Sequence, residues 1–301
     1  MRTGTRIASF LALLLLVFAG AALAGNRLDP EVEEPSEAMS TDEGAHGGSH
    51  ASGEEPLSAT PGLAVAAGDH RLVVPRTRVA AGREAVLEFS VVDDRGTVHD
   101  FDVEHERRMH LIVVRQDFQA FQHLHPEQRA DGSWVARVDT RRPGAYRMFA
   151  DFSTGGESLT LASDLFVPGD FRPEPLAPAR STADAGDGYR VVLDSVPAGA
   201  GQTVESDFEI SRNGEPVSEV QPYLGADGHL VALREGDQAF LHTHPQGEPG
   251  GAGPIRFDVS YPSAGRYRLY FQFRHGGRVR TAEFTRIAGP AGRGESASHE
   301  H

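Results

Sequence analysis

The sequence has 301 residues with 43 acidic and 29 basic side chains, so its formal net charge is -14, and it contains no cysteine. A chain of this length can hold about two ordinary domains. The negative charge argues against nucleic acid as a partner, because phosphates require a basic surface. The lack of cysteine excludes disulfides, thiolate metal sites and a cysteine nucleophile. A metal site would therefore use histidine, carboxylate, methionine or backbone ligands.

Residues 1–24 have the pattern of a secretory signal peptide. Arg2 and Arg6 precede an apolar run that ends in Ala22-Leu23-Ala24. The alternative is an uncleaved membrane anchor, since the run over residues 7–24 is nearly long enough to cross a bilayer. In either case we expect the rest of the chain to be extracytoplasmic: secreted, periplasmic, or anchored to a membrane by this segment alone and facing outward.

Three further segments are predicted to be linkers or tails. Residues 25–66 are rich in Glu, Asp, Gly, Ser and Pro and poor in large apolar residues, which predicts a disordered acidic linker. Residues 169–186 contain three prolines and follow a fourth, Pro168, which predicts a partly extended linker between two domains. Residues 289–301 predict a disordered tail.

The remaining sequence is a tandem duplication. Residues 70–126 match residues 189–245 with a constant offset of 119, and after a two-residue insertion the offset becomes 121. Phe89 thereby matches Phe208, and Tyr146 matches Tyr267. We therefore expect two domains of one fold, the first over residues 67–168 and the second over residues 187–288.

Each repeat is predicted to be an all-β, immunoglobulin-like sandwich of about seven strands, because short apolar runs alternate with Gly, Pro and Asp and helical periodicity is absent. Tyr146 and Tyr267 each follow a Gly-x step at the start of a strongly apolar run. This placement is typical of the tyrosine corner of such sandwiches. Met148 and Leu269 stand where antibody domains have a cysteine, so core packing would replace the disulfide.

The pattern His-x12-His-x-His-Pro occurs once in each repeat. In the first repeat we expect a β-hairpin with Gln116 and Asp117 in its turn. That register makes His110 face His123, and His125 shares their face because side chains two apart on a strand point the same way.

The second repeat predicts the same hairpin. Its turn would be formed by Glu235 and Gly236, so that His229 faces His242 and His244 lies on the same face.

Three imidazoles on one face predict a transition-metal site, with copper as the first choice and zinc as the alternative. Met109 is expected to point to the opposite face of its strand, which weakens it as a ligand. Glu104 and His105 could supplement the first site if the chain bends there. The aligned residues are Tyr223 and Leu224. We therefore expect the first repeat to hold the main site and the second repeat a weaker one.

Two alternatives remain open at this point. The histidines could be structural, because Ile112 and Phe121 share their face, and the chain would then be a binding or scaffolding module for an envelope or cell-surface protein. A metalloenzyme is the third reading, since a three-histidine zinc centre can activate water. No nucleophile elbow, phosphate loop or dinucleotide motif supports catalysis.

The phrases Met-His-Leu-Ile-Val-Val, His-Leu-His-Pro and Pro-Gly-x-Tyr-Arg-x-Phe-Ala-Asp-Phe resemble an uncharacterised secreted bacterial family of tandem β-sandwich modules. The resemblance covers residues 70–287 and extends distantly to YtkA-like and CopC-like metal-handling domains. It implies metal handling outside the cytoplasm. CopC-like proteins bind copper near a mature N-terminal histidine, whereas cleavage here would expose Gly25, so that copper site is not carried over. The leading hypothesis is a non-enzymatic copper buffer or carrier.

Overall fold

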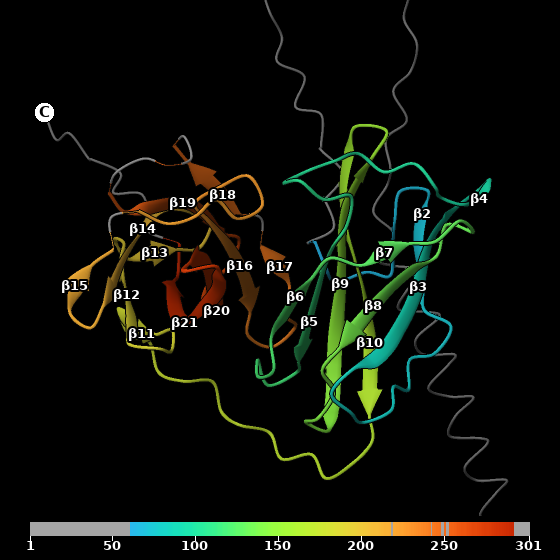
Figure 1. Ribbon diagram of the computed structural model, residues 1–301, viewed down its shortest axis with the longest axis horizontal. Coiled ribbons are helices and arrows are strands. Elements are labelled where there is room, and N and C mark those ends of the chain that lie inside the picture. The colour runs from blue at the N-terminus through green and yellow to red at the C-terminus, as the bar shows by residue number, and fades with distance from the viewer. Residues whose placement is uncertain (1–60, 218, 242, 248–249, 251–252, 292–301) are drawn as a thin grey trace, which may run out of the picture. The chain divides into compact units, whose positions relative to one another are not determined.

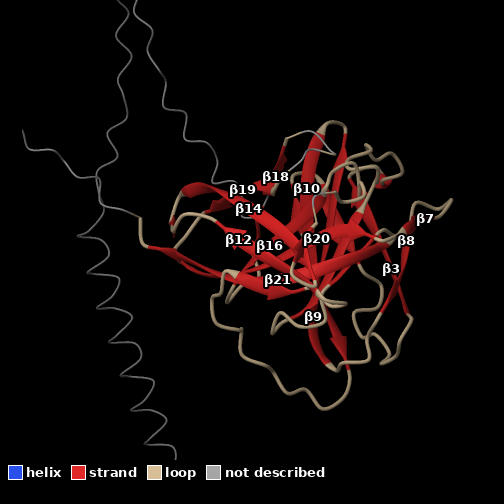
Figure 2. Cartoon of the chain, turned by 60° about the vertical axis from the view of Figure 1, so that its left-hand side comes forward, coloured by secondary structure: helices blue, strands red, loops and turns tan. Residues whose placement is uncertain are grey.

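The computed structural model describes residues 61–217, 219–241, 243–247, 250 and 253–291. Over these residues the chain consists of strands, turns and loops, and Figure 2 draws no helix among them. No helix of the described residues has the length and apolarity needed to cross a membrane. The predicted signal peptide, most of the predicted acidic linker and most of the predicted tail lie outside the described residues.

The first repeat folds into two antiparallel sheets (Figure 1). One sheet has the strand order β1-β2-β3-β8-β7 with β4 beside β3, and the other has the order β10-β9-β5-β6. The first sheet consists of β1 (Ala66–Ala67), β2 (His70–Val73), β3 (Ala85–Asp93), β4 (Gly96–Thr97), β7 (Glu127–Gln128) and β8 (Trp134–Val138). The second sheet consists of β5 (His110–Arg115), β6 (Gln122–Leu124), β9 (Gly144–Thr154) and β10 (Glu157–Val167).

The second repeat has the same arrangement. Its sheets have the orders β11-β12-β14-β19-β18, with β15 beside β14, and β13-β21-β20-β16-β17. The first of these sheets contains β11 (Thr182–Asp184), β12 (Tyr189–Asp194), β14 (Gln202–Arg212), β15 (Glu215–Pro216), β18 (Thr243–Gln246) and β19 (Ile255–Tyr261). The second contains β13 (Ala198–Gly199), β16 (Gly228–Arg234), β17 (Phe240–Leu241), β20 (Gly265–His275) and β21 (Arg278–Gly289).

The strand order is that of an immunoglobulin-like sandwich. In the first repeat β2, β3, β8 and β7 follow the order A-B-E-D, and β10, β9 and β5 follow the order G-F-C, with β6 added beside C. The second repeat gives the same two orders with β12, β14, β19 and β18 and with β21, β20 and β16. The predicted fold class is therefore confirmed. The expected strand number was too low, because short edge strands such as β1 and β4 were not recognised.

Both predicted tyrosine corners are present. Tyr146, near the start of β9, donates its hydroxyl to the carbonyl of Arg142 at 2.6 Å. Tyr267, near the start of β20, donates its hydroxyl to the carbonyl of Ser263 at 2.7 Å. The two bonds tie the F strand of each sandwich to the preceding turn.

The segment predicted as the inter-repeat linker is partly strand. Thr182–Asp184 forms β11, which pairs with β12. The second sandwich therefore begins before residue 187, inside the predicted linker 169–186. A three-residue edge strand lacks enough apolar residues for a sequence pattern to reveal it.

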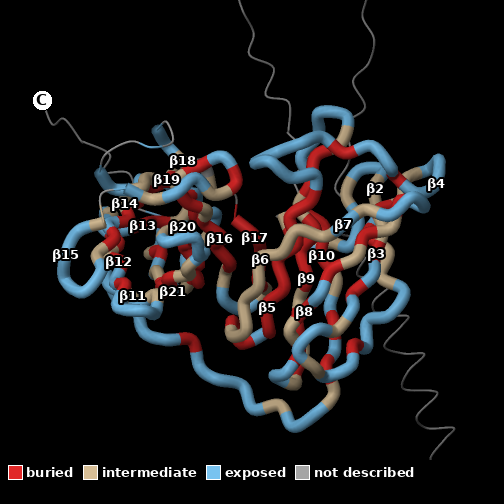
Figure 3. The backbone as a smooth tube through the Cα atoms, viewed as in Figure 1, coloured by how far each residue is buried: buried red, intermediate tan, exposed pale blue. Residues whose placement is uncertain are grey.

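The burial of β5 shows that both of its faces are covered, including the face that carries His110. In β3 the buried residues alternate with less buried ones, as expected for a strand with one face on the core. All six residues of β5 are buried, and Figure 3 draws the strand accordingly. Leu111 and Val113 pack into the core of the first sandwich, whereas Ile112 and Val114 belong to a separate apolar cluster.

That separate cluster joins the two repeats. It combines Ile112, Val114, Phe118, Phe149 and Ala162 of the first repeat with Val231, Leu233, Phe240 and Tyr270 of the second, together with Leu176 between them. The outer faces of the β5- and β16-containing sheets are therefore covered by each other. Because β5 is buried on both faces, its sequence is a nearly continuous apolar run and does not alternate between apolar and polar residues.

Contacts across this interface occur in equivalent pairs. Phe121 stacks on Tyr270 with ring centroids 3.9 Å apart. In the duplicated alignment Phe240 corresponds to Phe121 and Phe149 corresponds to Tyr270, and this second pair has centroids 5.6 Å apart. Reciprocal contacts of this kind are typical of an isologous interface between two copies of a fold.

Candidate metal centre

The hairpin that carries the first histidine motif forms, but its predicted register is wrong. Ile112 faces His123, and Leu111 faces Leu124, so the ladder is displaced by two residues from the expected pairing of His110 with His123. The turn is longer than two residues, since the N–H of Arg115 bonds the carbonyl of Gln119. A shift of two residues preserves the face of every side chain, so His110 and His123 still point the same way.

The second hairpin is displaced by the same amount. Ala232 faces Leu241 and Leu233 faces Phe240, so the expected pairing of His229 with His242 is also wrong. The longer turn is closed by a bond from the N–H of Arg234 to the carbonyl of Ala239. Both hairpins therefore have the same register, but their turns differ, because the acceptor Gln119 of the first hairpin aligns with Gln238 and not with Ala239.

The three histidines of the first motif lie together. His110, His123 and His125 each offer a ring nitrogen, and these three atoms all lie within 4.8 Å of one another. The ring centroids are 5.3 Å apart for His110 and His123 and 5.2 Å apart for His110 and His125. Such a group can supply three ligands to one transition-metal ion.

His229 of the second repeat lies against this group. Its ring centroid is 6.3 Å from that of His110 and 6.0 Å from that of His123. The ring centroid of His105 is 5.3 Å from that of His229 and 6.1 Å from that of His110. We call these five side chains the histidine cluster: His105, His110, His123, His125 and His229.

The other predicted ligands stand as follows. His242 lies outside the described residues. His244 lies in β18, where its backbone pairs with Asp258, and its side chain is outside the description. Met109 is 1% exposed and packs in the core of the first sandwich, on the face of its strand away from the cluster.

Hydrogen bonds to oxygen orient the imidazoles. His110 Nε2 lies 3.3 Å from the carbonyl oxygen of Glu104, and His229 Nε2 lies 3.3 Å from that of Leu224. His123 Nδ1 lies 2.8 Å from Oε1 of Gln272. An oxygen acceptor requires a protonated nitrogen, so each neutral ring keeps its lone pair on the other nitrogen.

The remaining ring nitrogens face one another. His110 Nδ1 and His123 Nε2 are 3.1 Å apart. With the oxygen partners above, both nitrogens carry lone pairs, and only a cation or an additional proton between them satisfies both. His125 Nε2 is buried and has no hydrogen-bond partner among the described residues. The cluster therefore directs nitrogen lone pairs to a common region.

The protein environment keeps these imidazoles neutral. Burial lowers the pKa of His125 to about 4, and His110 nearby adds to the effect. Burial also lowers the pKa of His229 to about 4, with His105 contributing. The pKa of His123 is held well below its usual value by burial and then by His110. Neutral imidazole is the form that binds a metal ion.

A cavity of about 480 Å³ adjoins the cluster. Its lining includes His110 and His229 together with the acidic residues Glu104 and Asp151. Glu104 also accepts hydrogen bonds from two serine hydroxyls, which hold its carboxylate in place. Carboxylates at the wall of a cavity favour the entry of a cation.

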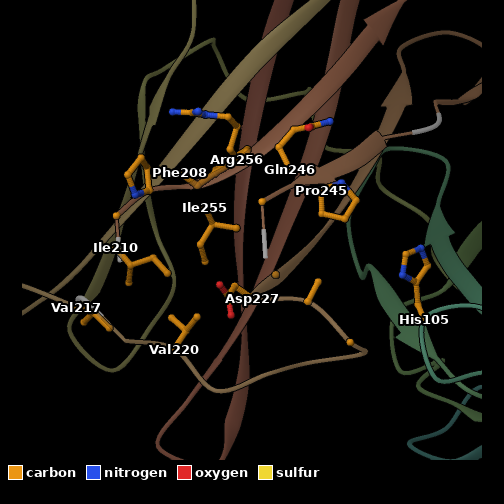
Figure 4. A pocket seen from close by; sticks show the side chains of 16 residues that line it. His105, Phe208, Ile210, Val217, Val220, Asp227, Pro245, Gln246, Ile255 and Arg256 are labelled. Carbon is orange, nitrogen blue, oxygen red and sulfur yellow. The ribbon is translucent and has the colours of Figure 1, made fainter. Parts of the chain in front are cut away.

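A second cavity, of about 380 Å³, borders the cluster only at His105. Its other lining residues belong to the second repeat, and many are apolar, such as Phe208 and Ile210. Figure 4 shows His105 set apart from the other labelled side chains. Among the described side chains, this cavity adds no further histidine to the cluster.

Two parts of this arrangement were missed by the sequence reasoning. Gln272 was not considered, and His229 was assigned to a separate site. Ile112 and Val231 lie on the same strand faces as the histidines in the two repeats. Because an apolar sheet face requires a covering partner, these residues could have indicated that the two faces pack on each other.

Comparison with known proteins places the family. No curated protein matches the chain. Among solved structures, the adhesin FdeC of Escherichia coli is 18% identical with a TM-score of 0.26, and the match covers 76% of this chain and 66% of that one. The chain thus spans just under two thirds of the adhesin's length.

Two other solved structures match over nearly their whole length. A chimeric titin Z1Z2 tandem is 15% identical, with a TM-score of 0.21 and coverage of 72% of this chain and 95% of that one. Domains 4 and 5 of the S-layer protein SbsC are 10% identical, with a TM-score of 0.22 and coverage of 75% and 98%. At these TM-scores the likenesses carry no argument about function.

A family model matches each repeat separately, over residues 66–169 and residues 182–289. The two matches together cover more than half of the chain and coincide with the two sandwiches. The chain therefore belongs to the family described as Domain of unknown function (DUF8832), of which it contains two tandem copies.

Proposed function

We propose that the chain is an extracytoplasmic, non-enzymatic metal-binding protein, a buffer or carrier, whose main site is formed by His110, His123 and His125. Copper is the first choice of ion and zinc the alternative. The observation that carries the proposal is the approach of His110 Nδ1 and His123 Nε2 to 3.1 Å, while the other nitrogen of each ring lies against an oxygen acceptor.

This separation fits a shared metal ion. Nitrogen ligands about 2.0–2.1 Å from a tetrahedral ion lie about 3.3 Å from one another. His110 and His123 need only small movements to reach that value. His125, whose Nε2 is buried without a partner among the described residues, supplies the third nitrogen.

The donor set supports a divalent ion of intermediate softness. Both methionines in the described residues, Met109 and Met148, are buried in the core of the first sandwich and cannot bind at the cluster. Imidazole ligands alone suit copper(II) and zinc, and copper(II) binds a given nitrogen site more tightly than zinc does. Thioether ligation of copper(I) finds no support at this site.

The location and the absence of catalysis are part of the same proposal. The signal-peptide pattern of residues 1–24 supports export, and the resemblance to metal-handling domains stays a prediction. The second histidine set, His229, His242 and His244, was predicted to form a weaker site. We now assign His229 to the neighbourhood of the main site and make no further assignment for the other two.

The test is a competition titration of copper(II), and separately of zinc, into the full chain. A chelator holds weak sites empty, including those that the histidines of the terminal segments could form. We expect tight binding by the wild-type chain and its loss in the double variant H123A/H125A. The variant H99A removes an exposed histidine of the same repeat outside the cluster and should bind as the wild type does.

Two outcomes would contradict the proposal. Unchanged tight binding in H123A/H125A would place the ion elsewhere. A wild-type chain that binds neither ion against the chelator, together with a loss of stability in the double variant, would make the histidines structural.

A further inference from the structure

Gln272 connects the second repeat to a histidine of the first. It lies in β20, is 6% exposed, and faces His229 across the ladder between β16 and β20. Its Oε1 is 2.8 Å from His123 Nδ1, and its Nε2 donates to the hydroxyl of Thr281 at 3.2 Å. The amide is therefore held at both ends, with its oxygen directed at the imidazole.

This contact selects one tautomer of His123. An amide oxygen can only accept, so Nδ1 of His123 must carry the proton and Nε2 keeps the lone pair. That lone pair is the one that faces His110 Nδ1. A metal-binding histidine commonly donates its second ring N–H to an oxygen that fixes both tautomer and ring orientation.

We propose that Gln272 is a positioning residue for the metal site: it holds His123 in the tautomer and orientation in which Nε2 binds the ion. The inference rests on the proposed function. It also means that binding by the first repeat depends on the second, because the residue that orients one of its ligands is contributed across the interface.

The alignment of the two repeats predicts which substitutions of Gln272 would preserve its role. The equivalent of Gln272 in the first repeat is Asp151, which faces His110 across the ladder between β5 and β9. A neutral amide and a carboxylate are both oxygen acceptors for an imidazole N–H. A carboxylate raises the basicity of the ligand more strongly. Glutamate at position 272 should therefore preserve the positioning role, and methionine should abolish it.

The test uses the full chain and three variants. Q272M keeps the length of the side chain but removes the acceptor, and we expect its metal affinity to fall by about 10–100-fold. Q272E retains an acceptor and should bind at least as tightly as the wild type. Q238M is the matched control, because Gln238 is also buried and donates across the interface to the carbonyl of Arg115, without contacting a histidine.

A second measurement is made on the metal-free protein. Ring-nitrogen NMR should show His123 protonated at Nδ1 in the wild type and in Q238M, and a loss of that single tautomer in Q272M. This readout separates positioning from a general weakening of the interface, which Q238M would share.

The inference is overturned if Q272M binds metal as tightly as the wild type, if Q238M weakens binding as much as Q272M does, or if His123 is protonated at Nε2 in the wild type. A wild-type chain that binds no metal would remove the proposed function. The tautomer in metal-free protein would still decide whether Gln272 positions His123.

Discussion

The two histidine hairpins come from one duplicated sequence but have different surroundings. In the first hairpin the ion pair at the turn, Arg115 with Asp117, is only 4% and 5% exposed at its side chains. The ion pair at the turn of the second hairpin joins Arg234 to Asp237, which aligns with Phe118 and not with Asp117, and it is 20% and 40% exposed. The first hairpin is thus enclosed, whereas the second keeps contact with solvent at its turn.

The surroundings of the two equivalent histidines differ as well. His110 is hydrogen-bonded to the backbone carbonyl of Glu104 and lies near His105. The residues aligned with Glu104 and His105 are Tyr223 and Leu224, which carry no carboxylate or imidazole. Because the two outer faces pack on each other, His229 and Gln272 of the second repeat lie at the histidine cluster, next to His110 and His123 of the first.

The largest expected effect tests the difference between the two turns. Removal of one partner from a buried ion pair leaves an uncompensated charge and costs about 3–5 kcal/mol, whereas an exposed pair contributes about 1 kcal/mol or less. We therefore expect D117A to lower the free energy of unfolding far more than D237A, as measured by urea denaturation. Equal losses would show that the first turn is no more enclosed than the second.

The next effect concerns the pH dependence of the metal-free cluster. An unfolded imidazole has a pKa of about 6.5. In the folded chain the pKa of His125 and of His229 is about 4. Between these values the unfolded chain binds protons that the folded chain does not, so stability is fully present above pH 6.5 and is lost as the pH falls toward 4.

For His229, the more deeply buried of the two, the loss is on the order of 3 kcal/mol. Urea unfolding at pH 7.5 and at pH 4.5 should show a smaller pH-dependent loss in H125A/H229A than in the wild type. The variant H99A serves as the control. If the double variant lost as much stability as the wild type between the two pH values, the cluster would not be the source of the dependence.

The smallest effect tests how closely the repeats approach each other. Gly62 has a φ of +72°, and a Cβ there would lie 2.8 Å from atoms of both Phe149 and Phe240. We expect G62A to lower the free energy of unfolding by about 1–3 kcal/mol, because the added methyl overpacks the interface. At Gly82 nothing lies within 4 Å of a Cβ, so G82A should be nearly neutral. Similar stabilities of the two variants would contradict the close approach.

Much of the fold could be predicted from the sequence, because its signals are local. The constant offset revealed the duplication, and the position of Tyr146 after a glycine revealed the tyrosine corner. The hairpin register could not be obtained this way. Phe118 has a positive φ of 65° and is buried in the cluster between the repeats, so packing against the second repeat draws it out of the ladder.

The composition of the site was harder to predict for a related reason. The grouping of His110, His123 and His125 depends only on the alternation of side chains along a hairpin, which survives a register shift of two residues. The approach of His229 and Gln272 depends on how two sandwiches pack on each other, and no local pattern specifies that. The uninterrupted apolar run of β5 was the available sign that its outer face is covered.

The central claim is that an ion binds where the two repeats meet. Anomalous diffraction from copper- or zinc-loaded crystals of the chain tests it most directly. We expect an ion about 2.0–2.1 Å from ring nitrogens of His110, His123 and His125, with Gln272 still bonded to His123 Nδ1. An ion bound by other residues, with no ion between His110 Nδ1 and His123 Nε2, would contradict it.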